Sequence, residues 1–326
     1  MKENKYYSIP YISNSALTYF EVSPKYCRKR MDREIADIEK SYTFLGKQLH
    51  MNLLEPEEFE RNYTYLDFNT PKSKQQQAFC ADYVDLIKLY VPHEDALKDA
   101  YEANYVSSSE ASILKFSKNL YETNSEYIKY LQIKGDYREI LSKSRKELIT
   151  TITQAIKSHK KANTLILCPV EGAENESLNE FAVYWDYPIN GNGENLKCKS
   201  LIDRLVVDHI NKRITIVDLK TTGILGDFSE IISERNYWRQ LAFYRLAIQH
   251  SNLFPKDYKI DSYIVAVNTL DPFECRVYKL TDVEYHKQLM KINSLMLKIS
   301  WHWFSNQWDH TRAYYEGDGT ENHVNE

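Results

Sequence analysis

Two acids and a lysine have the residue types and spacing that could perform chemistry. Residues 214–220 end in Asp218 and Lys220, two positions apart, and the apolar segment before them contains Asp203. Side chains alternate along a β-strand, so Asp218 and Lys220 are expected on one face. An Asp-x-Lys at a strand end is also common as an exposed ion pair. Both segments are otherwise strongly apolar, however, which makes a surface position the poorer explanation for the two acids.

The short link between the two segments sets their expected register. A tight hairpin centred between Ile210 and Asn211 places Asp203 directly opposite Asp218. Opposed Cβ atoms lie about 4.5–5.5 Å apart, and carboxylates that close repel unless a proton or a cation lies between them. A divalent ion such as Mg²⁺ takes oxygen ligands. Lys220 could then orient a water on that ion or stabilise charge on a phosphoryl group. The three groups match what phosphodiester hydrolysis requires.

Composition limits the class of protein. With 326 residues, 43% hydrophobic and 27% charged, the chain is ordinary for a globular protein with a sizeable core. A net charge of −4 argues against binding to nucleic acid through global positive charge, although residues 25–33 form a local basic run. That run is a candidate contact for a DNA backbone or a solvated helix face.

Several other classes are disfavoured by missing motifs. No glycine-rich nucleotide loop is present. The five cysteines include no C-x-x-C pair, so neither a disulfide framework nor a zinc knuckle is expected. The chain shows neither a signal peptide nor an apolar run of the ~20 residues that a membrane span needs. The expected location is cytoplasmic, with no membrane association.

The pattern of the sequence changes from helical to strand-like near residue 164. Helical patterns cover residues 14–20, 41–54, 72–91, 108–133 and 135–159. Strands are expected at residues 164–168, 181–185, 196–207, 214–219, 261–268 and 274–280, with helices at residues 229–250 and 282–304. The prediction is therefore an α/β (α+β) protein with a central mixed sheet flanked by helices. Its expected parts are a helical N-terminal region at residues 1–160, a core at residues 161–308 and a disordered polar tail at residues 309–326.

Four segments together resemble the PD-(D/E)xK nuclease superfamily, in its RecB-like and RecE-like branch that includes phage exonucleases. They are a serine-rich helix leading to a proline at residues 13–26, Gly46-x-x-x-His50, residues 202–204 with 216–222, and Gln240-x-x-x-Tyr244. Each motif is weak alone, but four in order are specific. The resemblance implies a restriction-endonuclease-like core.

The resemblance also implies roles for individual residues. Asp203 and Asp218 would bind metal with His50 and the backbone at Leu219, and Lys220 would be the catalytic lysine. Glu180, Ser15, Gln240 and Tyr244 would support the site or contact DNA. Without the resemblance, His50 would be an ordinary helix histidine and Tyr244 a core residue. Glu180 is as well explained as a strand-edge surface acid.

The function implied by the resemblance is a Mg²⁺-dependent deoxyribonuclease, with Mn²⁺ substituting and no iron–sulfur cluster, because Cys27 and Cys275 are isolated. The expected reaction is exonucleolytic processing of double-stranded DNA ends for recombination or repair, in a bacterial cytoplasm or a phage-infected host. Expected partners are DNA, a single-strand annealing protein and other copies of the chain. The alternatives are a structure-specific endonuclease and an inactive DNA-binding relative.

Overall fold

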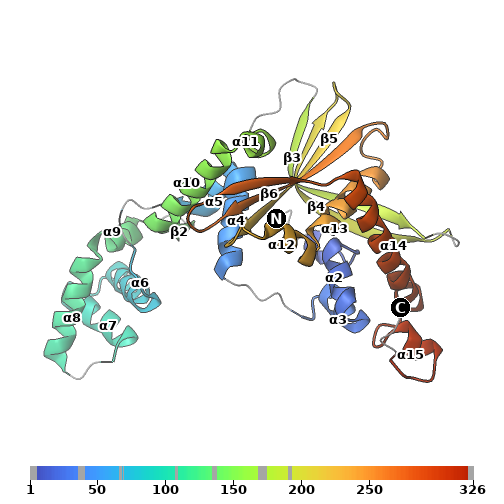
Figure 1. The fold of residues 1–326 in the computed structure, drawn as a ribbon. Helices are drawn as coiled ribbons and strands as arrows, with labels where there is room; N and C mark the ends of the chain where they lie inside the picture. The colour runs from blue at the N-terminus through green and yellow to red at the C-terminus, as the bar shows by residue number, and fades with distance from the viewer. Residues whose placement is uncertain are drawn as a thin grey trace. The chain divides into compact units, whose positions relative to one another are not determined.

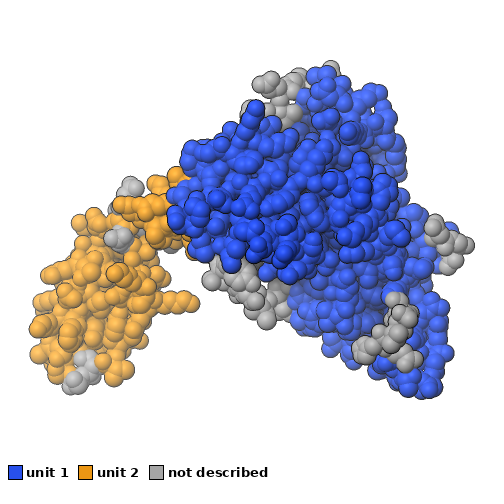
Figure 2. Space-filling view, in the orientation of Figure 1, with its two compact units in different colours: residues 1–55, 151–326 blue, residues 56–150 orange. Residues whose placement is uncertain are grey.

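The chain forms two compact units. The computed structural model describes residues 6–35, 41–65, 68, 70–106, 109–133, 138–167, 175–189 and 193–321. Unit 1 comprises residues 1–55 and 151–326, and unit 2 comprises residues 56–150 (Figure 2). The expected boundary near residue 160 does not coincide with this division, because the first 55 residues belong to the same unit as the sheet.

A five-stranded mixed sheet organises unit 1 (Figure 1). Its strands follow the order of the chain: β3 (Glu176–Pro188), β4 (Asn195–Asp208), β5 (Arg213–Thr222), β6 (Lys259–Asn268) and β7 (Cys275–Lys279). All neighbours are antiparallel except β5 and β6, which are parallel. Parallel neighbours need a crossover, and α12 (Phe228–Glu234) with α13 (Tyr237–His250) provides it. The predicted fold class, a mixed sheet flanked by helices, is confirmed.

Helix α13 is the central helix of unit 1. It buries an apolar face that includes Leu241, Phe243 and Leu246 within the main core. One helix was predicted over residues 229–250, but Asn236 adopts a left-handed backbone with φ 56° and separates α12 from α13. Left-handed conformations cannot continue a right-handed helix, and Asn tolerates them better than most residues.

Three helices of unit 1 come from the N-terminal segment. They are α2 (Asn14–Val22), α3 (Pro24–Met31) and α4 (Ser41–Leu54). As expected for a serine cap, the Ser13 side chain accepts a hydrogen bond from the Ala16 amide, and Ser23 caps α3 in the same way. A long C-terminal helix, α14 (Asp282–Ser305), packs against α13 and α2.

Residues 164–168 were predicted to be a strand, and this prediction is wrong for its described part. Helix α11 (Lys160–Ile166) covers it and begins where His159 Nδ1 accepts the Ala162 amide. A short apolar run does not distinguish a buried strand from a buried helix by periodicity. Cys168 lies outside the described residues.

Unit 2 is mostly helical and has its own core. It contains α5 (Pro56–Asn62), α6 (Lys74–Lys88), α7 (His93–Asn104), α8 (Glu110–Thr123), α9 (Ser125–Ile133) and the start of α10 (Lys143–Ser158). A two-stranded parallel sheet joins β1 (Tyr63–Tyr65) to β2 (Glu139–Leu141). The core gathers around Phe79, Tyr83 and Leu97.

The expected disordered tail is partly structured. Helix α15 (Arg312–Glu316) lies within it, and its Glu316 accepts a hydrogen bond from the Trp301 indole at 3.0 Å. His310 and Thr311 both contact the Glu321 carboxylate. The tail was expected to be disordered because its composition is polar. Composition does not show that a side chain elsewhere in the fold, here Trp301, will contact the tail and order it. In the part of the chain described, no helix is long and apolar enough to span a bilayer.

Candidate metal centre

Three carboxylates form a row across neighbouring strands. The pairs Asn179–Arg204 and Phe181–Ile202 place Glu180 of β3 opposite Asp203 of β4. The pair Arg204–Val217 confirms the register predicted for the next hairpin, in which Asp203 and Asp218 are the following opposed residues. Opposed residues point to the same face of a sheet. The sheet therefore brings three acids to one side.

The β4–β5 pairing ends where the acids begin. Arg204–Val217 is the final backbone pair, although β4 continues along β3 and β5 continues along β6. Beyond it, the Asp203 side chain accepts the Leu219 amide at 2.8 Å, which supplies a hydrogen bond that the ladder no longer provides. The strands thus separate at the acids, and a side chain bridges them.

Glu180 has an unusual backbone. Its φ is +46°, in the left-handed region that non-glycine residues rarely adopt inside a strand. Such a conformation costs on the order of 1–3 kcal/mol and often marks a functional position. Here it interrupts the regular pairing of β3 between Asn179 and Phe181 and sets the direction of the Glu180 side chain.

Helix α4 brings a histidine to this row. Gly46 lies one turn before His50, and a Cβ built on Gly46 would approach Thr221 Oγ1 of β5 to 3.1 Å. The glycine therefore permits α4 to lie close to β5, and residues four apart share a helix face. His50 Nε2 lies 2.8 Å from the Leu219 carbonyl oxygen.

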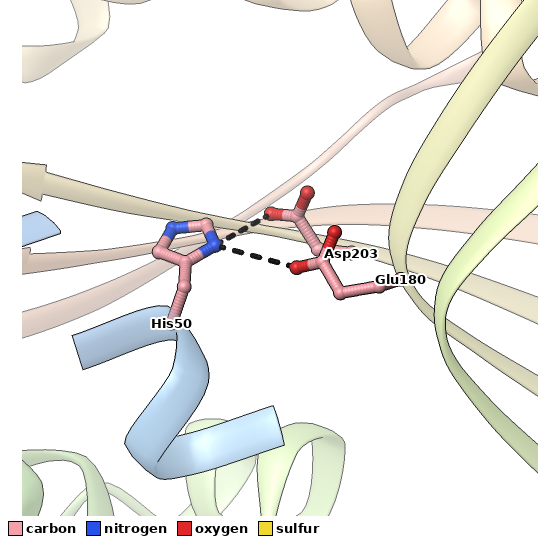
Figure 3. A group of neighbouring side chains, drawn as sticks. All are labelled: His50, Glu180 and Asp203. Carbon is pink, nitrogen blue, oxygen red and sulfur yellow. Dashed lines mark ion pairs between the residues drawn. The ribbon is translucent and has the colours of Figure 1, made fainter. Parts of the chain in front are cut away.

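His50, Glu180 and Asp203 form a group in which one potential ligand atom from each lies within 4.8 Å of the others (Figure 3). His50 Nδ1 is 3.7 Å from Asp203 Oδ2 and 4.0 Å from Glu180 Oε1. An imidazole nitrogen and two carboxylate oxygens are suitable ligands for a divalent cation. Glu180, for which the sequence left two explanations open, belongs to this group.

The group has two carboxylates and a neutral imidazole, and this excess of negative charge favours the binding of a cation. Burial lowers the pKa of His50 to about 4, and Lys220 adds to the effect, so the imidazole is neutral at pH 7. With Nε2–H directed at the Leu219 carbonyl, the Nδ1 lone pair faces Glu180 and Asp203, an orientation that suits a metal ligand. Burial raises the pKa of Asp203. A cation would relieve the carboxylate repulsion.

Asp218 and Lys220 form an ion pair beside this group. Asp218 is 1% exposed, its Oδ2 lies 2.8 Å from Lys220 Nζ, and its Oδ1 has no hydrogen-bond partner among the described residues. Burial raises the pKa of Asp218 to about 6, with Lys220 opposing and Asp203 adding to the shift. Burial alone would lower the pKa of Lys220, but Asp218 and then Asp203 outweigh it and raise that pKa. Lys220 is therefore an ammonium at neutral pH.

One expected ligand, Asp218, is not part of this group of side chains, and its carboxylate pairs with Lys220. The Leu219 carbonyl oxygen accepts a hydrogen bond from His50 Nε2. The structure thus gives Leu219 an orienting contact with the imidazole.

Helix α13 contributes the second layer of the site. Gln240 Nε2 donates to the Tyr244 hydroxyl at 2.7 Å, so the two residues predicted to share a helix face are in direct contact. Burial, then the charges of Asp218 and Asp203, raises the pKa of Tyr244 well above its usual value. Lys220 Nζ lies 4.8 Å from the centre of the Tyr237 ring. The sequence did not predict a role for Tyr237, because a tyrosine at the start of a helix does not indicate which strand residue it will contact.

Ser15 is not brought to the acids. It is exposed on α2, where Ser13 is the capping residue. The adjacent face of α2 instead contacts α13: Arg239 donates to Asn14, Thr18 and Glu21. Asn14, Thr18 and Glu21 are spaced by four and three residues, which places them on one helix face. That spacing could have predicted a shared partner for this face.

The basic run at residues 25–33 has partners within the protein. Lys25 pairs with Asp309 at 2.9 Å, Arg28 with Asp32 at 2.7 Å and Lys29 with Glu34 at 3.7 Å. These exposed pairs are weak and could exchange for phosphate. They nevertheless reduce the positive charge that the run offers.

Comparison with known proteins agrees with the site. Residues 95–305 match the family model of the PD-(D/E)XK nuclease superfamily, and the chain belongs to that superfamily. No curated protein matches the chain.

The solved structures that match this chain include the following two. One is a protein from Eubacterium rectale described provisionally as an exonuclease, with 13% identity, 97% of this chain and 90% of that chain covered, and a TM-score of 0.50. At this identity the likeness shows the fold. The other, SSO0001, has 14% identity, 79% and 86% coverage, and a TM-score of 0.25.

Proposed function

We propose that the protein is a metal-dependent deoxyribonuclease that acts as an exonuclease on double-stranded DNA ends. The observation that carries the proposal is the convergence of His50, Glu180 and Asp203 next to the buried Asp218–Lys220 pair. Membership of the nuclease superfamily supports the reaction class. The preference for DNA ends, and a role in recombination or repair for a phage, follow the RecE-like sequence pattern and the fold shared with the Eubacterium rectale protein.

Each residue has a defined part in the proposed reaction. His50, Glu180 and Asp203 would hold the cation, expected to be Mg²⁺ with Mn²⁺ substituting, and Asp218 would lie beside it. Bound there, a divalent cation would lower the pKa of a water and polarise a phosphoryl oxygen. Lys220 donates hydrogen bonds to the attacking water or to a phosphate oxygen, and Asp218 holds its ammonium in position. The Leu219 carbonyl and amide orient His50 and Asp203.

The decisive experiment compares DNA substrates with the intact protein. Linear duplex labelled at the 5′ or 3′ end is incubated with Mg²⁺ or with EDTA, alongside covalently closed circular DNA. We expect metal-dependent release of nucleotides from linear DNA and no cleavage of the closed circle. Cleavage of the circle would favour the structure-specific endonuclease, and no cleavage of either DNA would favour an inactive DNA-binding relative.

Lys220→Ala tests whether this site performs the hydrolysis. The variant should lose at least ~100-fold in kcat, as when a positioned electrostatic group is removed, while keeping its affinity for DNA in Ca²⁺. Lys197→Ala, which removes an exposed lysine of β4, serves as the matched control. Full activity in the Lys220 variant would place catalysis elsewhere.

The ligand group is tested by titrating the metal. Glu180→Gln and His50→Ala should each raise the Mg²⁺ concentration needed for half-maximal rate, by about 10-fold or more. Glu176→Gln, at the exposed start of the same strand, should not. Unchanged Mg²⁺ titrations would remove both residues from the metal site.

A further inference from the structure

A cluster of basic side chains lies on the sheet of unit 1, away from the proposed active site. Arg213 at the start of β5 and Lys259 at the start of β6 are paired, so their side chains share one face. Tyr263 of β6 and Lys279 of β7 are paired further along the same face. Lys161 of α11 reaches this place too, because its Nζ lies 4.9 Å from the centre of the Tyr263 ring.

A buried carboxylate holds two of these side chains in position. Asp261 of β6 is 6% exposed, and its two oxygens lie 2.8 Å from Lys279 Nζ and 3.5 Å from Arg213 Nε. Burial alone would raise the pKa of Asp261, but Lys279 and then Arg213 outweigh it and lower that pKa, so the carboxylate is ionised at neutral pH. Lys279 Nζ also lies 5.6 Å from the centre of the Tyr263 ring. These contacts fix the direction of the basic side chains before any partner binds.

The basic cluster has more positive charge than the nearby acids can balance. Lys161 and Lys259 are exposed and form no ion pair with any residue that the structure describes. Asp208, which is paired with Arg213, accepts two hydrogen bonds from Asn211. Even with this second acid, the positive charges of the cluster outnumber the negative ones, although the chain as a whole has a net charge of −4. Gathered like charges repel, and a bound anion would relieve that repulsion.

We propose that the basic cluster binds the phosphate backbone of duplex DNA outside the active site. The inference rests on the proposed function for the identity of the polymer, and membership of the nuclease superfamily supports it. From Lys259 to Tyr263 the cluster extends about 13 Å along β6. That length suits a polymer with a phosphate every ~3.4 Å along each strand better than a single phosphate ion. Tyr263 is only 8% exposed and cannot stack on a base, so the contact is with the backbone and independent of sequence.

The basic cluster is separate from the catalytic group. Arg213 and Lys220 lie near opposite ends of β5, about 23 Å apart in an extended strand. Because an odd number of residues separates them along the strand, their side chains point to opposite faces of the sheet. The cluster therefore does not contact the phosphate that reacts, and it should affect DNA binding without changing kcat.

The salt dependence of DNA binding tests the proposal. Fluorescence anisotropy of labelled duplex, with the full chain in EDTA, gives the slope of log K against log salt concentration. Lys161→Gln with Lys259→Gln should reduce the steepness of that slope by about 2, because each lost phosphate contact removes nearly one unit. Lys161→Arg with Lys259→Arg keeps the charge and should retain the wild-type slope.

A charge-matched control separates a local contact from an effect of net charge. Lys287→Gln with Lys291→Gln removes the same charge from exposed positions of α14 and should retain the wild-type slope. An equal change of slope in this control overturns the proposal, as does a wild-type slope in the Gln variant of the cluster. A wild type that does not bind duplex even at low salt also overturns it.

Cleavage kinetics distinguish two sources of the bound DNA. If the basic cluster holds the flank of the duplex being cut, Lys161→Gln with Lys259→Gln should raise KM and leave kcat unchanged. If it holds a separate duplex, both constants should stay at the wild-type values while the binding slope still changes. Because binding is measured in EDTA, a chain that binds DNA through the cluster without cleaving it would contradict the proposed function alone.

Discussion

Burial and charge decide what each residue of the site can do. Asp218 would be costly as an isolated buried carboxylate, and its contact with Lys220 offsets part of that cost. The same contact keeps Lys220 charged although its side chain is only 19% exposed. Together they provide a fixed ammonium next to the His50, Glu180 and Asp203 group. Such a group costs no reorganisation when negative charge develops on a substrate.

Tyr237 is expected to hold that ammonium in place. Its ring lies under Lys220 Nζ at 4.8 Å, and a cation–π contact contributes about 0.5–2 kcal/mol. Tyr237→Leu should lower kcat several-fold with little change in KM, because the contact positions a catalytic group and does not bind DNA. Steady-state cleavage of labelled duplex measures both constants.

Tyr237→Phe is the control for this prediction. It keeps the aromatic face and removes the hydroxyl, so its kcat should stay near that of wild type. Equal losses in the Leu and Phe variants would assign the effect to the hydroxyl and contradict the cation–π contact.

At the scale of elements, close contacts align α2, α4 and α13 with the sheet. Gly46 lets α4 approach β5, and the end of the β4–β5 ladder lets Asp203 reach the Leu219 amide. Helix α2 is held to α13 through Arg239, which is 1% exposed and has three side-chain partners on α2.

Replacement of Arg239 by Lys should destabilise unit 1 by about 2–4 kcal/mol. An ammonium cannot reproduce the planar set of donors that meets Asn14, Thr18 and Glu21 together, and at least one of these contacts with the buried residue 239 would be lost. Urea unfolding followed by tryptophan fluorescence measures the change. Arg235→Lys, at an exposed position before α13, should unfold like wild type.

Lys199 makes the docking of the N-terminal segment depend on pH. Its ammonium donates to the Tyr6 and Ile9 carbonyl oxygens, and burial lowers its pKa to about 8. An unfolded lysine titrates near 10.4, so between these values the unfolded chain binds more protons. The contribution of Lys199 to the free energy of unfolding therefore rises with pH in this window.

Comparison with Lys199→Met isolates this effect, because other titrations are common to both proteins. The stability of wild type minus that of the variant, from urea unfolding at pH 7 and at pH 9.5, should become larger at the higher pH. A difference that stays constant or shrinks would show that Lys199 titrates normally in the folded protein.

At the scale of the whole molecule, two units each have a separate core. The main core of unit 1 surrounds the sheet, and that of unit 2 surrounds Phe79 and Leu97. All five tryptophans belong to unit 1, whereas both units contain helices. Tryptophan fluorescence therefore reports unit 1 alone, and far-ultraviolet circular dichroism reports both.

Phe79→Ala should destabilise unit 2 by about 3–5 kcal/mol, because it opens a cavity at a fully buried side chain. Part of the circular dichroism transition should move to lower urea while the fluorescence midpoint stays unchanged. Phe243→Ala, buried in unit 1, should move the fluorescence midpoint instead. If Phe79→Ala moved both signals equally, the two units would unfold as one.

The sequence by itself determined the local features of this protein. Apolar runs predicted β4 and β5, the short link between them predicted their register, and that register placed Asp203 opposite Asp218. The Gln240–Tyr244 spacing predicted that both side chains share one helix face, because neighbours on one helix are fixed by its period. Ordered motifs also indicated the superfamily to which the chain belongs.

Only the tertiary structure decided which of these features meet. The left-handed Glu180, the Tyr237 ring against Lys220 and the Arg239 contacts with α2 join residues far apart in the chain. The α15 contacts and the division into residues 1–55 with 151–326 likewise depend on packing. Periodicity describes one element at a time, whereas a metal site depends on the distances between elements, which are set when their faces pack together.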